Sequence, residues 1–382
     1  MATDNYSQFD EIRPFNPSEL PAVYDRLLAS EQFRKVLTYL YPGVDMQTIA
    51  GMMHRCRTNL EFQKALCYPF LEQLLAKASH GCDMDASAID SGKRYTFVSN
   101  HRDIVLDSAL LDKMLIDNGF TTTCEIAIGD NLLSLPWVRD LVRVNKSFIV
   151  ERSLQPRQML MASKRLSEYM HLVISDKNDN IWIAQREGRA KDSDDRTQPS
   201  VLKMMAMGGD RNPIESLKQM HIVPLAISYE YDPCDYLKAR EFQLKRDVEG
   251  WKKSPQDDVE SMRVGIMGFK GRIHYHCAPC VDDWLESIGS TLPKTELFNA
   301  LAEEIDKRIF SSYRLYANNY VAAHKLGDTD YSDKFTKEEE ETFMRYIDGQ
   351  LTKIDIPDKD EEYLRERLLV MYANPLFNSL IV

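Results

Sequence analysis

The alternation of apolar and polar positions divides the chain into a helical beginning, a mixed middle and a helical end. Apolar residues such as Leu66, Phe70 and Leu74 recur at helical spacing within residues 60–78, and this predicts helices there. A polar connector over residues 81–92 separates them from the middle part. There, short apolar runs predict strands at residues 94–100, 123–129, 147–151, 180–185 and 221–229, and helical spacing predicts helices at 104–119 and 155–175.

Strands that alternate with helices indicate a sheet with crossover connections. We therefore expect an α/β fold with a mixed, mainly parallel central sheet flanked by helices. Residues 263–277 predict two further strands around Lys270 and Gly271. From residue 294 onward the pattern is helical, and Thr336 with Glu339 forms a capping box at one helix start. The expected organisation is an N-terminal helical segment (1–90), an α/β domain (91–290) and a helical, acidic C-terminal extension (291–382).

Composition and charge exclude several classes of protein. The 382 residues are 43% apolar and 28% charged, which is typical of a globular chain, and the net charge of −11 argues against nucleic acid as a partner. Residues 328–366 hold 14 acidic and 6 basic residues, whereas residues 131–165 hold 7 basic and 2 acidic ones. The basic segment predicts contact with an anion, and the alternative is an ordinary solvated helix face.

Neither a membrane span nor a signal peptide is expected from the sequence, and we therefore expect a cytoplasmic protein. No apolar run approaches the roughly 18–20 residues of a membrane span, and the polar N-terminal sequence is unlike a signal peptide. Seven scattered cysteines suggest free thiols in a reducing compartment.

One short segment concentrates residues that can carry chemistry. The sequence SNHRDIVLD follows an expected strand and opens an expected helix, so its polar side chains lie at the carboxyl end of a strand, where α/β sheets bind ligands. Within it, His101 with Asp103 or Asp107 makes a candidate general-base pair, because a carboxylate orients the imidazole and stabilises its protonated form. A histidine beside an aspartate at a helix start can equally be a capping or surface feature.

Four ordered blocks resemble the glycerolipid acyltransferases of the His-x4-Asp family, the glycerol-3-phosphate and lysophosphatidate acyltransferases. The blocks are SNHRDIVLD (99–107), VNKSFIVER (144–152), QREGRAKD (185–192) and IVPLAIS (222–228). The sequence departs from the family at three places. The family spacing selects Leu106 instead of an acid, Lys146 stands where a glycine is expected, and Arg189 directly follows Gly188. We favour Asp107 as the partner of His101 and keep Asp103 as the alternative.

The resemblance implies acyl transfer from a thioester, acyl-CoA or acyl carrier protein, to a hydroxyl of a phosphorylated glycerol acceptor. It makes His101 the base, supported by Asp107, with no metal and no cofactor. Acceptor phosphate is expected at Arg152 first and Arg189 next, with Lys191 as a substitute, while Glu187, Gly188 and Lys146 complete the site. An alternative for Arg152 is an ion pair with Glu151 or Asp140.

The acceptor implies a membrane surface as a further partner. The residues of segment 132–146, apolar and basic together, suit an interfacial position, or else a core helix with a basic outer face. We expect a cytoplasmic protein, peripheral at the inner face of the cytoplasmic membrane. The acceptor could also be another hydroxylated or amino-acid-linked lipid, and a non-catalytic acyl- or phospholipid-binding relative is the second class of function.

A metal site is a competing interpretation of His274, His276, Cys277 and Cys280, since these are zinc-ligand residue types. The alternation of the two histidines with Tyr275 favours core packing at a strand end instead, and we expect no metal.

Overall fold

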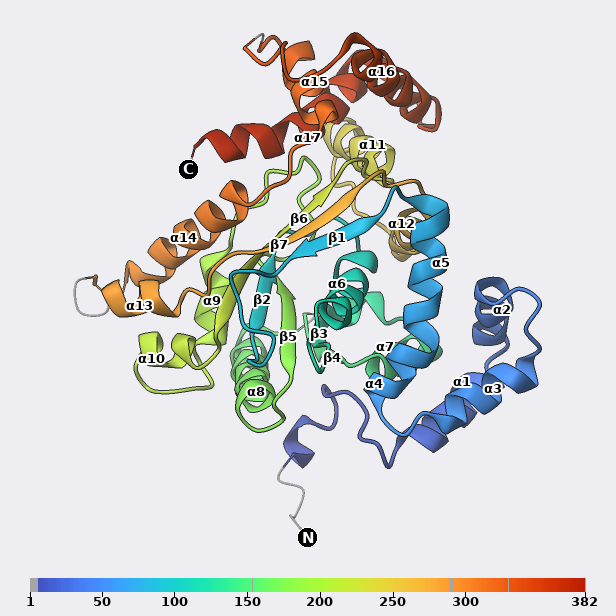
Figure 1. Ribbon diagram of the computed structural model, residues 1–382, viewed down its shortest axis with the longest axis vertical. Helices are drawn as coiled ribbons and strands as arrows, with labels where there is room; N and C mark the ends of the chain where they lie inside the picture. The colour runs from blue at the N-terminus through green and yellow to red at the C-terminus, as the bar shows by residue number, and fades with distance from the viewer. Residues whose placement is uncertain (1–5, 153, 289–291, 294, 329, 382) are drawn as a thin grey trace.

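A central sheet with helices on both faces forms the body of the protein (Figure 1). The computed structural model describes residues 6–381 except 153, 289–291, 294 and 329. In this part of the chain, seven strands pair in the order β1-β7-β6-β2-β5-β3-β4. The strands are β1 (Cys82–Asp85), β2 (Thr96–Ser99), β3 (Cys124–Gly129), β4 (Ser147–Val150), β5 (Asn180–Ala184), β6 (Ile222–Tyr229) and β7 (Ile273–Cys277).

Strand direction brings the ends of five strands to one edge. β6, β2, β5, β3 and β4 are mutually parallel, while β7 pairs antiparallel to β6 and parallel to β1. The predicted mixed, mainly parallel sheet is therefore confirmed. β2 lies in the middle, and all four of its residues are buried, as expected of a parallel strand covered on both faces. We call the edge where these five strands end the carboxyl edge.

The helices are α1 (Leu20–Ala29), α2 (Glu31–Leu40), α3 (Met46–Arg55), α4 (Asn59–Phe62), α5 (Tyr68–Ala78), α6 (Leu106–Asp117), α7 (Pro136–Val144), α8 (Pro156–Ser175), α9 (Pro199–Met205), α10 (Pro213–Lys218), α11 (Asp235–Asp247), α12 (Pro255–Met267), α13 (Asp282–Ile288), α14 (Leu297–Ser311), α15 (Ala317–Lys325), α16 (Lys337–Thr352) and α17 (Glu361–Leu380). A π-helical turn, Gln63–Cys67, joins α4 to α5.

Neighbouring residues of β2 show how the sheet separates two cores. Val98 packs in a cluster with residues of α8, α9 and α14, whereas Phe97 packs in a second cluster with residues of α5 and α6. Successive side chains of a strand point to opposite faces, so both faces of this strand need apolar residues. Two further clusters hold the N-terminal helices around Tyr24 and the C-terminal helices α15–α17 around Leu364. The segment boundaries at 90 and 290 stay predictions.

Two expected elements are wrong in type. The connector over 81–92 contains an edge strand, β1, because Cys82 and Met84 alternate with acids and pair with β7. Residues 263–267 end helix α12 and form no strand, so only the second of the two strands expected in 263–277 exists. The capping box of Ser254 with Asp257 starts this helix. A short apolar run cannot by itself distinguish strand from helix.

Candidate active site

The loop after β2 carries His101 to the carboxyl edge. Asn100 continues the pairing of β2 with β6 through its side chain, since its Nδ2 donates to the Ile227 carbonyl at 2.9 Å and its Oδ1 accepts from the Ile227 N–H at 2.8 Å. The chain then leaves the sheet, and His101 is the first side chain beyond it. His101 keeps 14% of its side-chain surface exposed, so a substrate hydroxyl can reach it. The ring of Trp182 in β5 packs edge to face against the imidazole, with the two ring centroids 5.5 Å apart.

Asp107, in the first turn of α6, lies against His101. One oxygen, Oδ2, contacts His101 Nδ1 at 2.8 Å and accepts from the backbone N–H of Arg102 at 2.6 Å and of Asp103 at 3.0 Å. The loop therefore wraps around the carboxylate, and this accommodates the residue by which the spacing exceeds the family pattern. Leu106, which the family spacing would select, is fully buried in the core.

Asp103 has a different position and task. Its Oδ1 accepts from the N–H groups of Val105 and Leu106, both at 2.8 Å, and so caps the start of α6. Burial, followed by the nearby charge of Asp107, raises the pKa of Asp103. Gly265 of α12 packs on the other oxygen, and a Cβ there would lie 1.9 Å from Oδ2. Of the two candidate acids, the structure thus sets Asp107 beside the histidine.

A buried ion pair fixes the residue next to His101. Arg102 Nη1 donates to Asp195 Oδ2 at 2.7 Å, and both side chains are buried. Burial raises the pKa of Asp195, with the charge of Arg102 opposing that shift. Removing either partner would leave an uncompensated buried charge, so the loop is held firmly.

The second and third sequence blocks meet at the far end of the carboxyl edge. Arg152 follows β4, and its Nη1 lies 3.7 Å from Glu187 Oε1 in the loop after β5. Its Nε is buried without a hydrogen-bond partner in the described residues, and a Cβ on Gly129 would lie 2.8 Å from it. Gly188 adopts a φ of 70°, which glycine allows readily. The alternative partners of Arg152 are engaged elsewhere, because Glu151 pairs with Arg165 and Asp140 pairs with Arg26.

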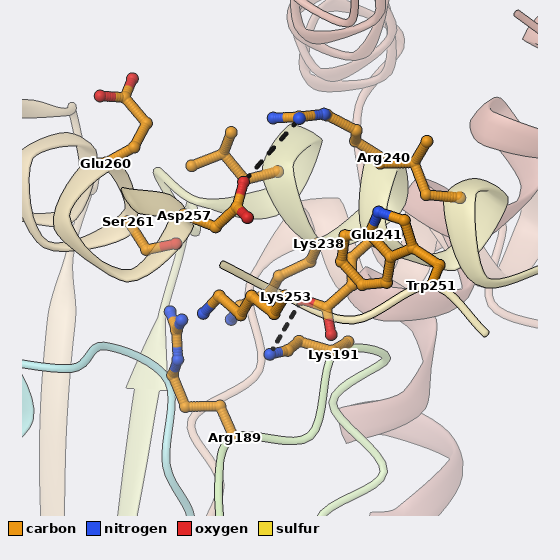
Figure 2. A pocket seen from close by; sticks show the side chains of 12 residues that line it. Arg189, Lys191, Lys238, Arg240, Glu241, Trp251, Lys253, Asp257, Glu260 and Ser261 are labelled. Carbon is orange, nitrogen blue, oxygen red and sulfur yellow. Dashed lines mark ion pairs between the residues drawn. The ribbon is translucent and has the colours of Figure 1, made fainter. Parts of the chain in front are cut away.

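A cationic pocket lies between the loop after β5, α11 and α12 (Figure 2). Its basic lining residues are Arg189, Lys191, Lys238, Arg240 and Lys253. Three acids, Glu241, Asp257 and Glu260, line it as well, so the charge of the lining is net positive.

Two guanidinium nitrogens in this pocket lack partners. Arg189 is 8% exposed, and its buried Nη1 makes no hydrogen bond with any described residue, nor does the buried Nε of Arg240. Lys191 pairs with Glu241 at 3.2 Å. Burial first, and the charge of Arg189 next, lower the pKa of Lys191 to about 8. Crowded cations with unused donors form an arrangement that an anion would stabilise.

Comparison with known proteins identifies the domain. Residues 83–228 match the family model described as Acyltransferase. This segment of the chain is therefore an acyltransferase domain. The predictions of this family and of an acyltransferase enzyme are therefore confirmed. A solved structure, the 1-acyl-sn-glycerophosphate (LPA) acyltransferase PlsC from Thermotoga maritima, is similar at 12% identity and a TM-score of 0.36, over 76% of this chain and 92% of that one. Comparison with curated proteins finds no match.

Lys146 of the acyltransferase domain does not reach this site, and its predicted role in substrate binding is corrected here. It precedes β4, so it lies at the amino ends of the parallel strands, opposite to His101. Its ammonium group is buried against Asp179 at 2.9 Å and Thr122 at 3.1 Å. Its φ of 61° explains why the family pattern expects glycine at this position.

Sequence patterns missed the part of the pocket that comes from α11 and the loop after it. Lys238, Arg240 and Lys253 follow the matched segment and lie in no family block. A signal was present in α11, because Asp235, Lys238 and Gln243 occupy its buried face at helical spacing. Polar residues at core positions of a helix indicate a buried polar network.

Segment 132–146 is partly covered by the rest of the protein, with Leu135 and Arg139 left exposed, and its interfacial position stays a prediction. Leu133 is buried in the core, and Trp137 packs against Phe33 and donates to Gln32 Oε1 at 2.8 Å. Arg143 donates to backbone carbonyls of the N-terminal segment and stacks over Phe15 at 4.1 Å. In the described part of the chain, no helix is long and apolar enough to cross a membrane.

Of the residues weighed as a zinc site, His274, His276 and Cys277 lie in β7, and Cys280 follows that strand. His274 is buried and pairs with Asp83 at 2.6 Å, and Cys277 is buried in the core. Across the described residues, one group of three metal-ligand types comes together, His221, Cys280 and Asp282, away from the carboxyl edge. There His221 Nδ1 already pairs with Asp282 Oδ2 at 2.6 Å.

Proposed function

We propose that the protein moves a fatty acyl group from a thioester donor, acyl-CoA or acyl carrier protein, to a hydroxyl of a phosphorylated glycerol acceptor. The acceptor would be 1-acyl-sn-glycerol-3-phosphate or glycerol 3-phosphate. The observation that carries the proposal is the 2.8 Å contact of His101 Nδ1 with Asp107 inside an acyltransferase domain. A paired, partly exposed histidine favours a catalytic protein over a non-catalytic lipid-binding relative.

In the proposed reaction, His101 acts as the base. Its Nδ1–H donates to Asp107, so Nε2 carries the free lone pair, and Nε2 makes no hydrogen bond with the described residues. Nε2 removes the acceptor's hydroxyl proton as the oxygen attacks the thioester carbonyl. The tetrahedral intermediate expels the thiolate, which takes the proton back from the imidazolium that Asp107 stabilises. The thioester is already activated, so the chemistry needs no covalent enzyme intermediate, metal or cofactor.

The cationic pocket is the proposed place of the acceptor's phosphate. Arg189 and Arg240 offer unpaired donors there, and planar guanidinium groups bind phosphate oxygens well. Lys238 lines the pocket and donates to the carbonyl of Arg102, which supports a position close to His101.

Arg152, the leading phosphate residue from sequence, is farther away. β4 is three strands from β2 in the sheet, and strands are spaced by about 4.8 Å, so Arg152 starts roughly 14 Å from the His101 strand. Glycerol phosphate is shorter than that span. We therefore rank Arg189 above Arg152 for the acceptor, with Arg152 and Glu187 left for another part of the substrates.

Membrane attachment is proposed at the start of α8, on the carboxyl edge. Leu160 and Met161 are 63% and 68% exposed, Met159 is exposed as well, and Arg157 is an exposed cation on the same turns. Exposed apolar side chains beside a cation suit an anionic lipid surface. We propose that the protein is a cytoplasmic enzyme that attaches through this surface to the inner face of the cytoplasmic membrane.

One assay tests the function. Purified protein receives a labelled acyl thioester and a panel of acceptors, namely glycerol 3-phosphate, lysophosphatidate, and hydroxylated or amino-acid-linked lipids, and lipid masses identify the product. We expect acyl transfer to a phosphorylated glycerol, and we expect the turnover rate to fall roughly 10²–10⁴-fold in His101→Ala. His171→Ala, at a histidine of α8 bonded to Ser167 and Ser216, is the matched control. Unchanged turnover in His101→Ala would remove this mechanism, and transfer only to an unphosphorylated lipid would replace the acceptor.

A further inference from the structure

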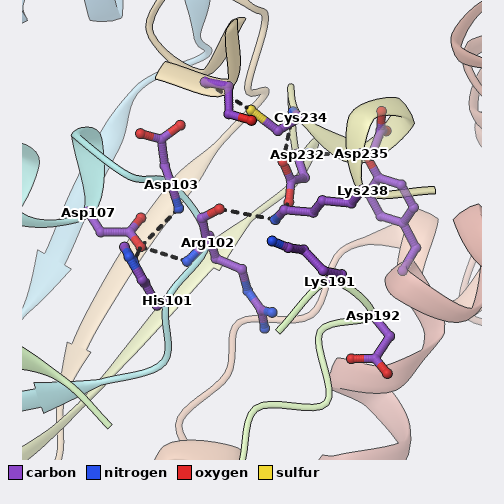
Figure 3. A network of polar contacts seen from close by, with 12 residues as sticks. His101, Arg102, Asp103, Asp107, Lys191, Asp192, Asp232, Cys234, Asp235 and Lys238 are labelled. Atoms are coloured by element: carbon purple, nitrogen blue, oxygen red, sulfur yellow. Dashed lines mark hydrogen bonds and ion pairs between the residues drawn. The ribbon is translucent and has the colours of Figure 1, made fainter. Parts of the chain in front are cut away.

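The peptide group between Arg102 and Asp103 is hydrogen-bonded at both of its ends. Its N–H, on Asp103, donates to Asp107 Oδ2 at 3.0 Å, and its carbonyl, on Arg102, accepts from Lys238 Nζ at 3.0 Å. Figure 3 shows this link between the His101 loop and α11. The ammonium group of Lys238 is thus joined to the carboxylate that contacts His101 by a single peptide unit.

Lys238 is built into the core of the protein. It is 2% exposed, and Asp232 is its ion-pair partner. Burying an ammonium group is costly unless it is paired and fully hydrogen-bonded. Here the carboxylate of Asp232 and the Arg102 carbonyl share that task, so both anchors hold the ammonium group in place.

The C-terminal helices fix these anchors. Tyr372 of α17 accepts from the backbone N–H of Asp232 at 3.0 Å and donates to Asp235 Oδ2 at 2.7 Å. Tyr346 of α16 donates to the same oxygen at 2.8 Å. Asn319 of α15 donates to the Tyr372 carbonyl at 2.7 Å. All of these residues lie beyond the matched acyltransferase segment, residues 83–228.

We propose that Lys238 is a positioning residue for His101, and that Tyr372 of the C-terminal extension holds Lys238 in place. The ammonium group polarises the 102–103 peptide, which makes the Asp103 N–H a stronger donor to Asp107. It also holds the loop in the conformation that brings Asp107 to Nδ1. The role in turnover rests on the proposed function, whereas the effect on His101 itself does not.

The sign of the effect follows from the charges around His101. Without Lys238, Asp107 receives a weaker hydrogen bond and attracts the imidazolium more strongly, so His101 keeps its proton to higher pH. The other charged groups that face this loop are Asp103 and Asp107 from α6 and its approach, Arg102, Arg189 and Asp195 after β5, Asp232 before α11, and Lys270 after α12. Loss of the Lys238 cation near these groups also favours the protonated form of His101.

The test compares three variants of one helix. Lys238→Met removes the charge, Lys238→Arg keeps a charged donor, and Lys245→Met removes an exposed lysine of α11 as the matched control. In histidine-labelled protein, the His101 resonance is assigned by its loss in His101→Ala and titrated without substrate. We expect its midpoint to rise by about half a pH unit or more in Lys238→Met, with Lys238→Arg between this variant and wild type, and no change in Lys245→Met.

Kinetics give the second readout. We expect kcat to fall roughly 10- to 100-fold in Lys238→Met and the acid limb of the pH–rate profile to move upward. An unchanged His101 midpoint together with unchanged kcat would overturn the proposal. A rise confined to the KM of the acceptor would also overturn it, and would assign Lys238 to the phosphate pocket alone.

Two further variants test the proposal in case Lys238→Met does not fold. Lys238→Met with Asp232→Asn removes both charges of the pair, and Tyr372→Phe removes one hydroxyl from α17. Both should shift the His101 midpoint upward in folded protein, by less in Tyr372→Phe. A folded double variant with the wild-type midpoint would refute the link. Wild-type protein that transfers no acyl group would defeat the proposed function, and the titration would still decide the role of Lys238.

Discussion

Replacing Asp107 by asparagine should separate the chemistry of His101 from its geometry. The amide keeps the shape of the carboxylate, and its oxygen can still accept from the backbone N–H groups of Arg102 and Asp103. What it loses is the negative charge at the 2.8 Å contact with His101 Nδ1. That charge matters only when the imidazole is protonated, and protonation accompanies attack on the thioester.

The size of the loss follows from Coulomb's law. The charge centres of an imidazolium and a carboxylate in hydrogen-bond contact are about 4 Å apart, which at an effective dielectric constant of 20 gives about 4 kcal/mol. At about 1.4 kcal/mol per factor of ten, the expected loss in kcat is on the order of 10³-fold. Asp103→Asn should cost far less, because Asp103 Oδ1 caps α6 and does not contact the imidazole.

The assay measures single-turnover rates of acyl transfer for both variants at saturating donor and acceptor. Thermal unfolding of each variant confirms that it is folded, since the amide nitrogen replaces an oxygen, Oδ1, that is buried without a partner among the described residues. A loss in Asp107→Asn of less than tenfold, or a larger loss in Asp103→Asn, would show that Asp107 does not stabilise the imidazolium.

Three further predictions test the pocket and the extension. Arg189→Lys should raise the KM for the phosphorylated acceptor about ten- to a hundredfold and leave the donor KM unchanged. Arg152→Lys should raise the acceptor KM less. Steady-state kinetics with each substrate varied separately measure both constants, and a larger rise of the acceptor KM in Arg152→Lys than in Arg189→Lys would refute this assignment. Burial and the charge of Arg189 lower the pKa of Lys191 to about 8, so Lys191 should lose its charge as the pH rises from 7 to 9. The acceptor KM of the wild-type protein should therefore increase over that range, and that of Lys191→Arg should stay constant. An equal increase in the two proteins would assign the pH dependence to another group. Thr336→Ala removes the hydrogen bond that the Thr336 hydroxyl accepts from the Glu339 N–H at 3.2 Å. Urea denaturation should show that the free energy of unfolding falls by about 1 kcal/mol. A decrease of less than about 0.3 kcal/mol would show that α16 does not depend on this cap.

Local patterns in the sequence determined the elements of the central sheet and the chemistry at its edge. Apolar runs placed β2 through β6 within one or two residues, because a strand buried on both faces must be apolar throughout. Thr336 and Glu339 marked a helix start, because a capping box is satisfied within four residues. The position of His101 after a strand also followed from local order.

Tertiary structure decided everything that depends on residues distant in sequence. The choice of Asp107 over Asp103 depended on a loop that wraps around one carboxylate, and no spacing rule describes that path. Lys146 and His101 belong to two of the four family blocks, yet Lys146 precedes β4 and His101 follows β2, so the parallel strands place them at opposite edges. Lys238 reaches Arg102 across 136 positions. Such contacts arise from packing α11 and the C-terminal helices onto the carboxyl edge, where burial forces each charge to find a partner that neighbours in sequence do not supply.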